Sequence, residues 1–222
     1  MISTTTLHFL KELKENNSKE WMDANRASYE SAKQNVIELI ASVIASHGKS
    51  DHTIANQIAK SCLFRINRDI RFSKNKEPYK VNFGASITAG GRKAPLAGYY
   101  IHIEPGASFV GGGLYMPDPK ILKNIRQEID YNFEAIQQIL KSSSFVKTYG
   151  QLDASPEFLL SRVPKGYEQD HPAASLLKLK SYIALKPLTD QQLQSDKLSS
   201  MITDAMAALQ PLIAFLNQGM DV

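Results

Sequence analysis

Apolar residues recur at helical spacing at both ends and in the middle of the chain. The set at residues 7–13 predicts a short amphipathic helix that ends near Asn16. A second stripe, at residues 22–44, predicts a longer helix that begins beside Asn17 and Glu20, which have the spacing of a capping box. The middle and last helices follow from two further apolar sets: Ile121, Ile125, Ile129, Phe133, Ile136 and Leu140, then Leu198, Ile202, Ala205, Leu209, Leu212 and Leu216.

Between these helices the period of the pattern shortens toward two, as in β-strands. Pro105 and Gly106 separate two of the alternating segments and predict a tight hairpin turn. We therefore expect an α+β fold with a mostly antiparallel central sheet, covered by N-terminal, middle and C-terminal helices. The predicted strands form a meander and hairpin in residues 62–114, with segments at 63–67, 81–88, 99–103 and 108–114, and one further strand near residues 181–187.

Alternation also gives each predicted strand two different faces. Apolar and polar residues alternate along segment 81–88, and Tyr100, His102 and Glu104 share one side of the next segment. The apolar face is the one that helices would cover. The other face is polar, and it would form a groove lined by hydrogen-bond donors if Arg65 lies on the same side.

Length and composition fit an ordinary globular protein. The chain has 222 residues, which indicates one domain over residues 1–222, and its 43% hydrophobic and 22% charged residues exclude a disordered or collagen-like chain. No run approaches the roughly 18 apolar residues of a membrane span, and the N-terminus lacks the pattern of a secretory leader. The single cysteine, Cys62, is expected to pack in a strand and fits a reducing compartment. We therefore expect a cytoplasmic protein without a membrane contact.

Charge is concentrated in one short part of the chain. The net charge is +4, and segment 65–80 alone carries six basic and two acidic residues, so the whole formal excess lies there. Such a concentration indicates an anionic partner. The candidate ligand-binding residues are Arg65, Arg68, Arg71, Lys76 and Lys80, with Asp69 as the carboxylate that orients them. The alternative is structural, because Asp69 and Glu77 are available to pair with the same arginines.

The basic segment, from Phe64 to Lys80, resembles the signature of the family known as domain of unknown function 2461. Four other blocks resemble the same family in the same order: residues 16–21, 97–106, 111–117 and 164–167. The resemblance spans nearly the whole chain and implies a single-domain protein of a mainly bacterial family. It implies no catalytic residue. Asn75 stands where many relatives are expected to have aspartate, and this departure argues against a metal site.

Catalytic chemistry has two candidates in the sequence. His102 could act as an acid or a base near neutral pH and has Glu104 on the same predicted strand face, while Asp69 between arginines would stay ionised. No nucleophile motif accompanies either residue, so the sequence does not decide whether the protein is an enzyme. The five histidines are scattered without ligand spacing, and we expect no metal and no cofactor.

These observations predict a protein that binds an anionic ligand, bearing a phosphate or a carboxylate, through residues 65–80. Two alternatives remain. Phe64, Phe72 and Tyr79 are interleaved with the basic residues, as in a nucleic-acid-binding module. The chain could also be a non-enzymatic protein-interaction domain, in which the arginines brace the fold. The oligomeric state is not predicted.

Overall fold

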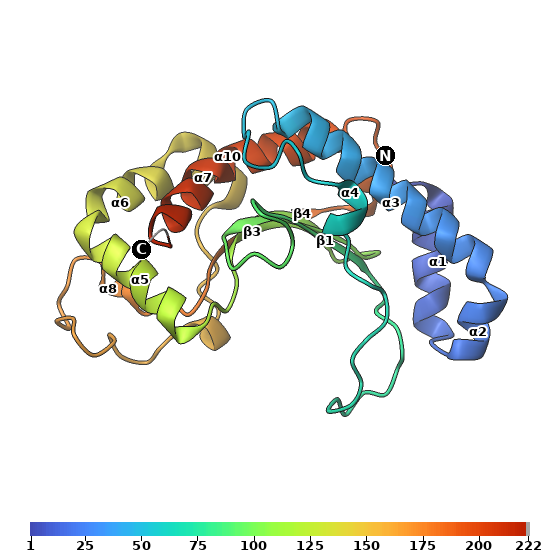
Figure 1. Ribbon diagram of the computed structural model, residues 1–222, viewed down its shortest axis with the longest axis horizontal. Helices are drawn as coiled ribbons and strands as arrows, with labels where there is room; N and C mark the ends of the chain where they lie inside the picture. Colours follow the sequence, from blue (N-terminus) through green and yellow to red (C-terminus); the bar gives the residue numbers. More distant parts are fainter. Residues whose placement is uncertain (221–222) are drawn as a thin grey trace. The chain divides into compact units, whose positions relative to one another are not determined.

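The computed structural model describes residues 1–220 and has the predicted α+β composition. Its four strands form one open antiparallel sheet in the order β1-β2-β3-β4 (Figure 1). The strands are β1 (Phe83–Ile87), β2 (Gly98–Ile103), β3 (Ser108–Leu114) and β4 (Tyr182–Leu188). The α-helices are α1 (Thr4–Glu15), α2 (Lys19–Ala24), α3 (Arg26–His47), α4 (Ala59–Cys62), α5 (Pro119–Tyr131), α6 (Phe133–Lys141), α7 (Ser143–Tyr149), α8 (Ala174–Leu177), α9 (Asp190–Leu193) and α10 (Leu198–Gln218), with a 3-10 turn, η1, at Pro156–Phe158.

The chain divides into two compact units. Unit 1 comprises residues 1–92, 100–110 and 187–204, and unit 2 comprises residues 93–99, 111–186 and the chain from Ala205 onward. Four of the five boundaries fall inside strands β2, β3 and β4 and inside helix α10, and the fifth follows Arg92 between β1 and β2. A single domain over residues 1–222 stays a prediction.

An aromatic cluster forms the core of unit 1. The rings of Phe9 in α1, Tyr29 in α3 and Phe83 in β1 lie 6.0–6.5 Å apart, centroid to centroid. Trp21 of α2 joins them at 5.8 Å from Phe9. These contacts pack three helices against one face of β1, because each ring comes from the apolar stripe of its own element.

The long helix predicted to begin at Asn17 is two helices, and the predicted capping box is wrong. Ser18 is the N-cap of α2, and its hydroxyl accepts a hydrogen bond from the Trp21 amide at 3.2 Å. Helix α2 ends at Asn25, which donates from its side chain to the Trp21 carbonyl at 2.9 Å. The Asn17 side chain is engaged elsewhere, by the backbone of Tyr79, so it cannot cap a helix.

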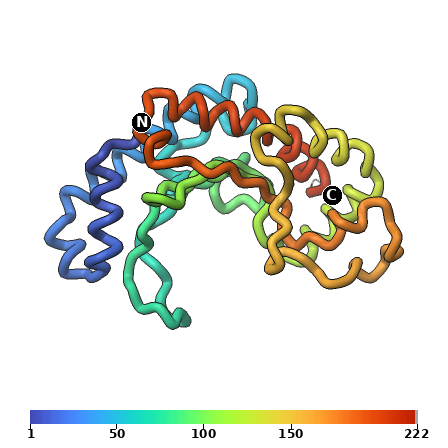
Figure 2. Tube along the Cα trace, turned by 180° about the vertical axis from the view of Figure 1, so that it is seen from behind, coloured from blue at the N-terminus to red at the C-terminus, as the bar shows by residue number. Residues whose placement is uncertain are grey.

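Residues 63–82 form a narrow loop with two antiparallel arms, which we call the ribbon. Figures 1 and 2 show that it extends away from the sheet on the side opposite α3. The expected strand at 63–67 is wrong, because only two isolated bridges form, Leu63 with Ala85 and Asn67 with Tyr79. The arms are held by single backbone bonds, such as Lys80 N–H to Ile66 C=O at 2.8 Å. Pro78 has no N–H to extend this ladder.

The placement of Cys62 in a strand is also wrong. Cys62 is the last residue of α4 and is buried in unit 1. Its apolar neighbour Leu63 is buried as well. Burial raises the pKa of the Cys62 thiol, so it packs as a small apolar group.

Alternation predicted the faces of the sheet correctly. Phe83, Ala85 and Ile87 are buried, and so are Tyr99, Ile101 and Ile103, whereas the residues between them on β2 are half-buried. The hairpin turn is also confirmed, with the Ala107 N–H donating to the Glu104 carbonyl at 3.0 Å and Gly106 at φ +78°. The half-buried side chains of β2 therefore lie on the face opposite its buried ones.

In unit 2, strand β3 passes very close to its neighbour β4. A Cβ on Gly113 would lie 2.0 Å from the Tyr182 carbonyl oxygen, and its φ is +115°. The triple glycine at 111–113 therefore has a structural role. Residues 118–140 form α5 and α6, broken at Asn132, instead of the single helix that was predicted. Helix α7 follows, and it begins because the Ser142 hydroxyl caps it by accepting from the Phe145 amide at 3.3 Å.

Helix α10 is long and apolar enough to cross a membrane by length and composition alone. Half of its most apolar window is buried inside the protein, including Leu209 and Leu212. Its apolar residues therefore have the arrangement expected of a core helix.

Candidate anion site on the polar face of the sheet

The basic segment has two parts: the tip, residues 68–77, in which three basic side chains have partners, and the base, which carries Arg65 and Lys80. At the tip, Arg71 donates from Nε and Nη2 to the two oxygens of Asp69, at 3.0 and 2.7 Å. Arg68 lies 3.4 Å from Glu77, and Lys76 donates to the Ile70 carbonyl at 3.1 Å. Three of the predicted ligand-binding residues therefore have partners inside the ribbon.

Asp69 has a defined electrostatic state at this tip. The hydrogen bonds from Arg71 lower the pKa of its carboxyl group, and Arg65 adds a smaller effect in the same direction. A carboxylate that stays ionised and is already held by one guanidinium is a poor general acid. This arrangement fits the structural use of arginine.

At the base of the ribbon, Arg65 and Lys80 meet a third cation, Arg92. The Arg92 guanidinium lies 4.9 Å from the centroid of the Phe64 ring, and the Lys80 ammonium lies 5.5 Å from the same centroid. Arg92 also donates to the Leu63 carbonyl at 2.5 Å, which fixes its position. We call Arg65, Lys80 and Arg92 the base cluster.

No carboxylate forms an ion pair with the base cluster within residues 1–220. Arg65 is exposed, whereas Lys80 and Arg92 are half-buried. Burial lowers the pKa of Lys80, and repulsion by Arg65 and Arg92 lowers it further. Three positive charges are thus held together without an ion-pair partner in the described residues, and a bound anion would relieve their repulsion.

A row of hydrogen-bonding side chains lies on the polar face of β2. The His102 Nε2 atom is 2.9 Å from a Glu104 carboxylate oxygen, so Nε2 carries the proton. Nδ1 is then an acceptor and faces the Tyr100 hydroxyl at 3.4 Å. The His102 ring is stacked on Phe109 of β3, with centroids 4.7 Å apart and an interplanar angle of 7°. The Glu104 contact and the stacking on Phe109 therefore hold the His102 ring in a fixed orientation.

Tyr100 connects this row to the base cluster. Its ring centroid lies 6.3 Å from that of Phe64, the ring that carries Lys80 and Arg92. Gly84 makes room for it, because a Cβ there would come within 2.3 Å of the Tyr100 hydroxyl oxygen. Burial raises the pKa of Tyr100, so its hydroxyl remains a donor at neutral pH.

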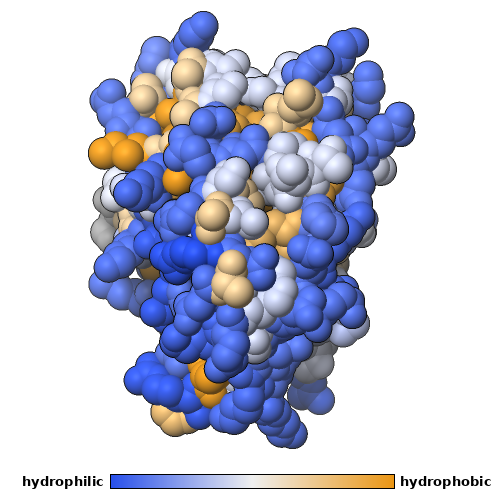
Figure 3. All heavy atoms as spheres, turned by 90° about the vertical axis from the view of Figure 1, so that its right-hand side faces the viewer, coloured by the Kyte–Doolittle hydropathy of each residue, from blue (hydrophilic) through white to orange (hydrophobic). Residues whose placement is uncertain are grey.

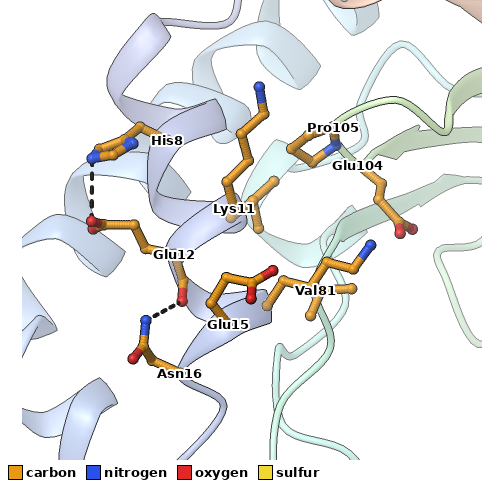
Figure 4. A pocket seen from close by; sticks show the side chains of 10 residues that line it. His8, Lys11, Glu12, Glu15, Asn16, Val81, Glu104 and Pro105 are labelled. Atoms are coloured by element: carbon orange, nitrogen blue, oxygen red, sulfur yellow. Dashed lines mark hydrogen bonds and ion pairs between the residues drawn. The ribbon is translucent and has the colours of Figure 1, made fainter.

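Glu104 also borders an open groove of about 540 Å³ in unit 1. Figure 4 shows Lys11 and Glu15 of α1 on one side of this groove and Val81, Glu104 and Pro105 on the other. The lining carries charges of both signs. The groove gives the His102–Glu104 pair an opening to solvent at its Glu104 end.

The described residues include no cluster of side chains that could ligate a metal ion. Among the described residues, no group of three His, Cys, Asp or Glu side chains could hold an ion. His171, in unit 2, is bound to Asp130 at 2.9 Å through Nε2 and accepts from the Ala173 amide at 3.0 Å through Nδ1. Both of its ring nitrogens are used, so it holds local structure.

Sequence reasoning missed Arg92, Tyr100 and Phe109 as parts of the site. The alternation of β2 placed Tyr100 on the face of His102, which was a usable signal. Arg92 lies outside the basic segment, and nothing in its local sequence indicates that it returns to Phe64. Only the turn at Gly90 and Gly91, both with positive φ, directs it there.

The family comparison agrees with the extent of the resemblance seen in the sequence. The family model described as conserved hypothetical protein, DUF2461, matches residues 5–215. Comparisons with curated proteins and with solved structures found no match. The matched range includes the ribbon, the base cluster and the row on β2, so the chain belongs to the DUF2461 family.

Proposed function

We propose that the protein binds a small anionic ligand, bearing a phosphate or a carboxylate, at the base cluster. The observation that carries this proposal is the juxtaposition of Lys80 and Arg92 over one ring, Phe64, without a carboxylate partner among the described residues. Arginine and lysine side chains are the common binders of phosphate and carboxylate oxygens. A ligand anion would supply the missing negative charge.

The position of the base cluster favours a small ligand. Lys80 and Arg92 are half-buried beside the sheet, and Arg92 is fixed by the Leu63 carbonyl. A preorganised, partly desolvated donor binds an anion more strongly than a free surface side chain does. Tyr100 and His102 would contact the uncharged part of the ligand, since Tyr100 adjoins Phe64.

The tip of the ribbon has a different role in this proposal. Arg68 and Arg71 already have carboxylate partners, Glu77 and Asp69, and act as braces. Of the residues predicted to bind the ligand, Arg65 and Lys80 keep that role, and Arg92 joins them. Catalysis by His102 stays a prediction, as does a cytoplasmic location.

Isothermal titration with inorganic phosphate, citrate and adenosine monophosphate tests this assignment at two salt concentrations. Lys80→Met and Arg92→Met each remove one cation, and we expect at least about tenfold weaker binding from the loss of one charge-assisted hydrogen bond. Arg71→Gln is the matched control, because it removes a cation from the tip and should leave the dissociation constant unchanged.

Two results would overturn the proposal. The first is an absence of saturable binding for all three anions with the folded wild-type protein. The second is wild-type affinity in both base variants, or an equal loss in Arg71→Gln. A thermal unfolding curve for each variant confirms that the protein compared is folded.

A further inference from the structure

The tip of the ribbon presents one bare aromatic side chain. Phe72 is 95% exposed, more than any other large hydrophobic residue among those described. At the lower end of Figure 3, where the ribbon lies, a small apolar patch stands among hydrophilic residues. A phenylalanine held in solvent loses the benefit of burial, and large exposed apolar groups often mark interaction sites.

The exposure of Phe72 results from an organised turn. The Ser73 amide donates to the Ile70 carbonyl at 3.3 Å, and the Lys76 ammonium donates to the same carbonyl at 3.1 Å. On the returning arm, the Glu77 amide donates to the Asn75 side chain at 2.8 Å. These bonds on both sides of residue 72 hold the backbone so that its side chain points outward.

Positive charge surrounds this ring. The Arg71 guanidinium lies 5.8 Å from the Phe72 centroid. The carboxylates of the tip are engaged, Asp69 by Arg71 and Glu77 by Arg68 and Asn75. Lys74 and Lys76 are exposed and have no carboxylate partner within residues 1–220. The tip therefore combines one accessible aromatic face with Lys74 and with Lys76, whose ammonium has further N–H donors beyond the one bound to Ile70.

We propose that the ribbon tip binds single-stranded nucleic acid, with a base stacked on Phe72 and backbone phosphates contacted by Lys74 and Lys76. Every base has a π-face, so one exposed ring with flanking cations recognises a strand with little sequence preference. Bases in a duplex are already stacked and would not offer that face. The inference concerns the tip alone and does not rest on the base cluster.

The composition of the tip favours a nucleic acid strand over a lipid surface. Membrane insertion would need a cluster of apolar side chains, and Ile70, the nearest one, is half-buried in the ribbon. A single ring is sufficient for stacking on a base.

Fluorescence anisotropy with labelled 20-nucleotide oligo-dT and oligo-U tests the inference over a range of KCl concentrations. We expect Phe72→Ala to weaken binding about fivefold or more, the loss of one stacked base, and Phe72→Trp to restore it. The double variant with Lys74→Gln and Lys76→Gln should make the slope of log K against log salt shallower by about 1.4, the effect of two phosphate contacts.

Two controls separate the tip from the rest of unit 1. Ile58→Ala removes another exposed apolar side chain, 68% exposed, and should leave strand binding unchanged. Arg92→Met removes a cation of the base cluster and should also leave the effect of Phe72→Ala unchanged. The phosphate titrations use another probe and depend on Lys80 and Arg92, whereas oligonucleotide binding depends on Phe72, Lys74 and Lys76, so failure of the base cluster and failure of the tip give different patterns.

Three results would overturn the inference. They are no binding of either oligonucleotide at low salt, wild-type affinity in Phe72→Ala, and a loss in Arg92→Met as large as that in Phe72→Ala. Sedimentation with vesicles of phosphatidylserine and phosphatidylcholine tests the competing surface. Binding to vesicles that depends on Phe72, without binding to oligonucleotides, assigns the tip to membranes and refutes the nucleic acid assignment.

Discussion

Replacing Asn17 with alanine tests how the ribbon is anchored to the N-terminal helices. The Asn17 side chain donates from Nδ2 to the Tyr79 carbonyl at 3.0 Å and accepts from the Tyr79 amide at 3.1 Å. Both bonds are partly buried, and Tyr79 itself is 8% exposed. One side chain thus satisfies both backbone groups of a residue on the returning arm of the ribbon, next to Lys80.

The expected loss follows from these two bonds. A hydrogen bond contributes about 0.5–1.5 kcal/mol net, and a buried backbone group left without a partner costs about 1–3 kcal/mol. Because the site is only partly buried, we expect Asn17→Ala to lower the free energy of unfolding by about 2 kcal/mol. For a chain of 222 residues that corresponds to a fall in Tm of about 4–8 °C.

Urea unfolding followed by the fluorescence of Trp21, the one tryptophan, measures this loss. Asn16→Ala is the matched control, because Asn16 is exposed and its side chain makes one bond, to the Glu12 carbonyl, so about 0.5 kcal/mol or less is expected. Asn17→Asp keeps an acceptor for the Tyr79 amide and loses the donor to its carbonyl. It should lose about 1 kcal/mol.

The aspartate variant also distinguishes two roles for Asn17. If Asn17 were a helix cap, Asn17→Asp would be tolerated, because aspartate caps helices as well as asparagine does. An Asn17→Asp protein as stable as the wild type would refute the backbone-pairing role. So would an Asn17→Ala protein within about 0.5 kcal/mol of the wild type.

Three further changes have outcomes set by the structure. Gly113→Ala should lose at least about 3 kcal/mol in urea unfolding, because its Cβ would meet the Tyr182 carbonyl at 2.0 Å at φ +115°, whereas Gly106→Ala, at φ +78° with no atom within 4 Å, should lose only about 1 kcal/mol. Burial lowers the pKa of His47, so the unfolded chain takes the proton first; the free energy of unfolding should fall as pH drops from about 7 to 5, and His47→Gln should flatten this slope. Burial also lowers the pKa of Lys80, so Lys80→Met should raise Tm at neutral pH without ligand while it weakens phosphate binding; an unchanged or lower Tm would contradict this.

The regular parts of the fold could be predicted because local pattern and tertiary packing agree there. Residues 99–103 alternate in the sequence, and the same residues alternate between buried and half-buried in β2. Thr189 and Gln192 have the spacing of a capping box in the sequence, and they form that box at the start of α9. Segment 63–67 shows the limit, since Leu63 and Ile66 are buried and Phe64 is exposed, and the segment forms isolated bridges instead of a strand.

Helix breaks at Asn25 and Asn132 could not be predicted from apolar periodicity. The apolar stripe continues across both positions, and at each the asparagine side chain bonds back to the preceding turn: Asn25 to the Trp21 carbonyl and Asn132 to the Glu128 carboxylate. Such a bond competes with the helical backbone, but asparagine also occurs inside helices. The sequence alone does not tell these cases apart.

The location of the candidate site could be predicted in part. The excess of positive charge in residues 65–80 is visible in the sequence, but the pairing of each cation depends on which residues the ribbon brings opposite one another. Asn67 faces Tyr79 across the ribbon, and this register brings Arg68 near Glu77. Because register depends on long-range contacts such as that of Asn17, the sequence could not assign it.

In this ribbon, whether a cation braces the fold or is available to a ligand depends on whether a carboxylate lies beside it. Arg71 pairs with Asp69, two residues away, and this exposed ion pair has little effect on the stability of the fold. Lys80 is partly desolvated beside like charges, an arrangement that lowers stability unless an anion binds. If Lys80 only braced the fold, a carboxylate would be expected beside it, as Asp69 lies beside Arg71 at the tip. The absence of one beside Lys80 in the described chain is therefore the strongest argument that the base of the ribbon serves a ligand.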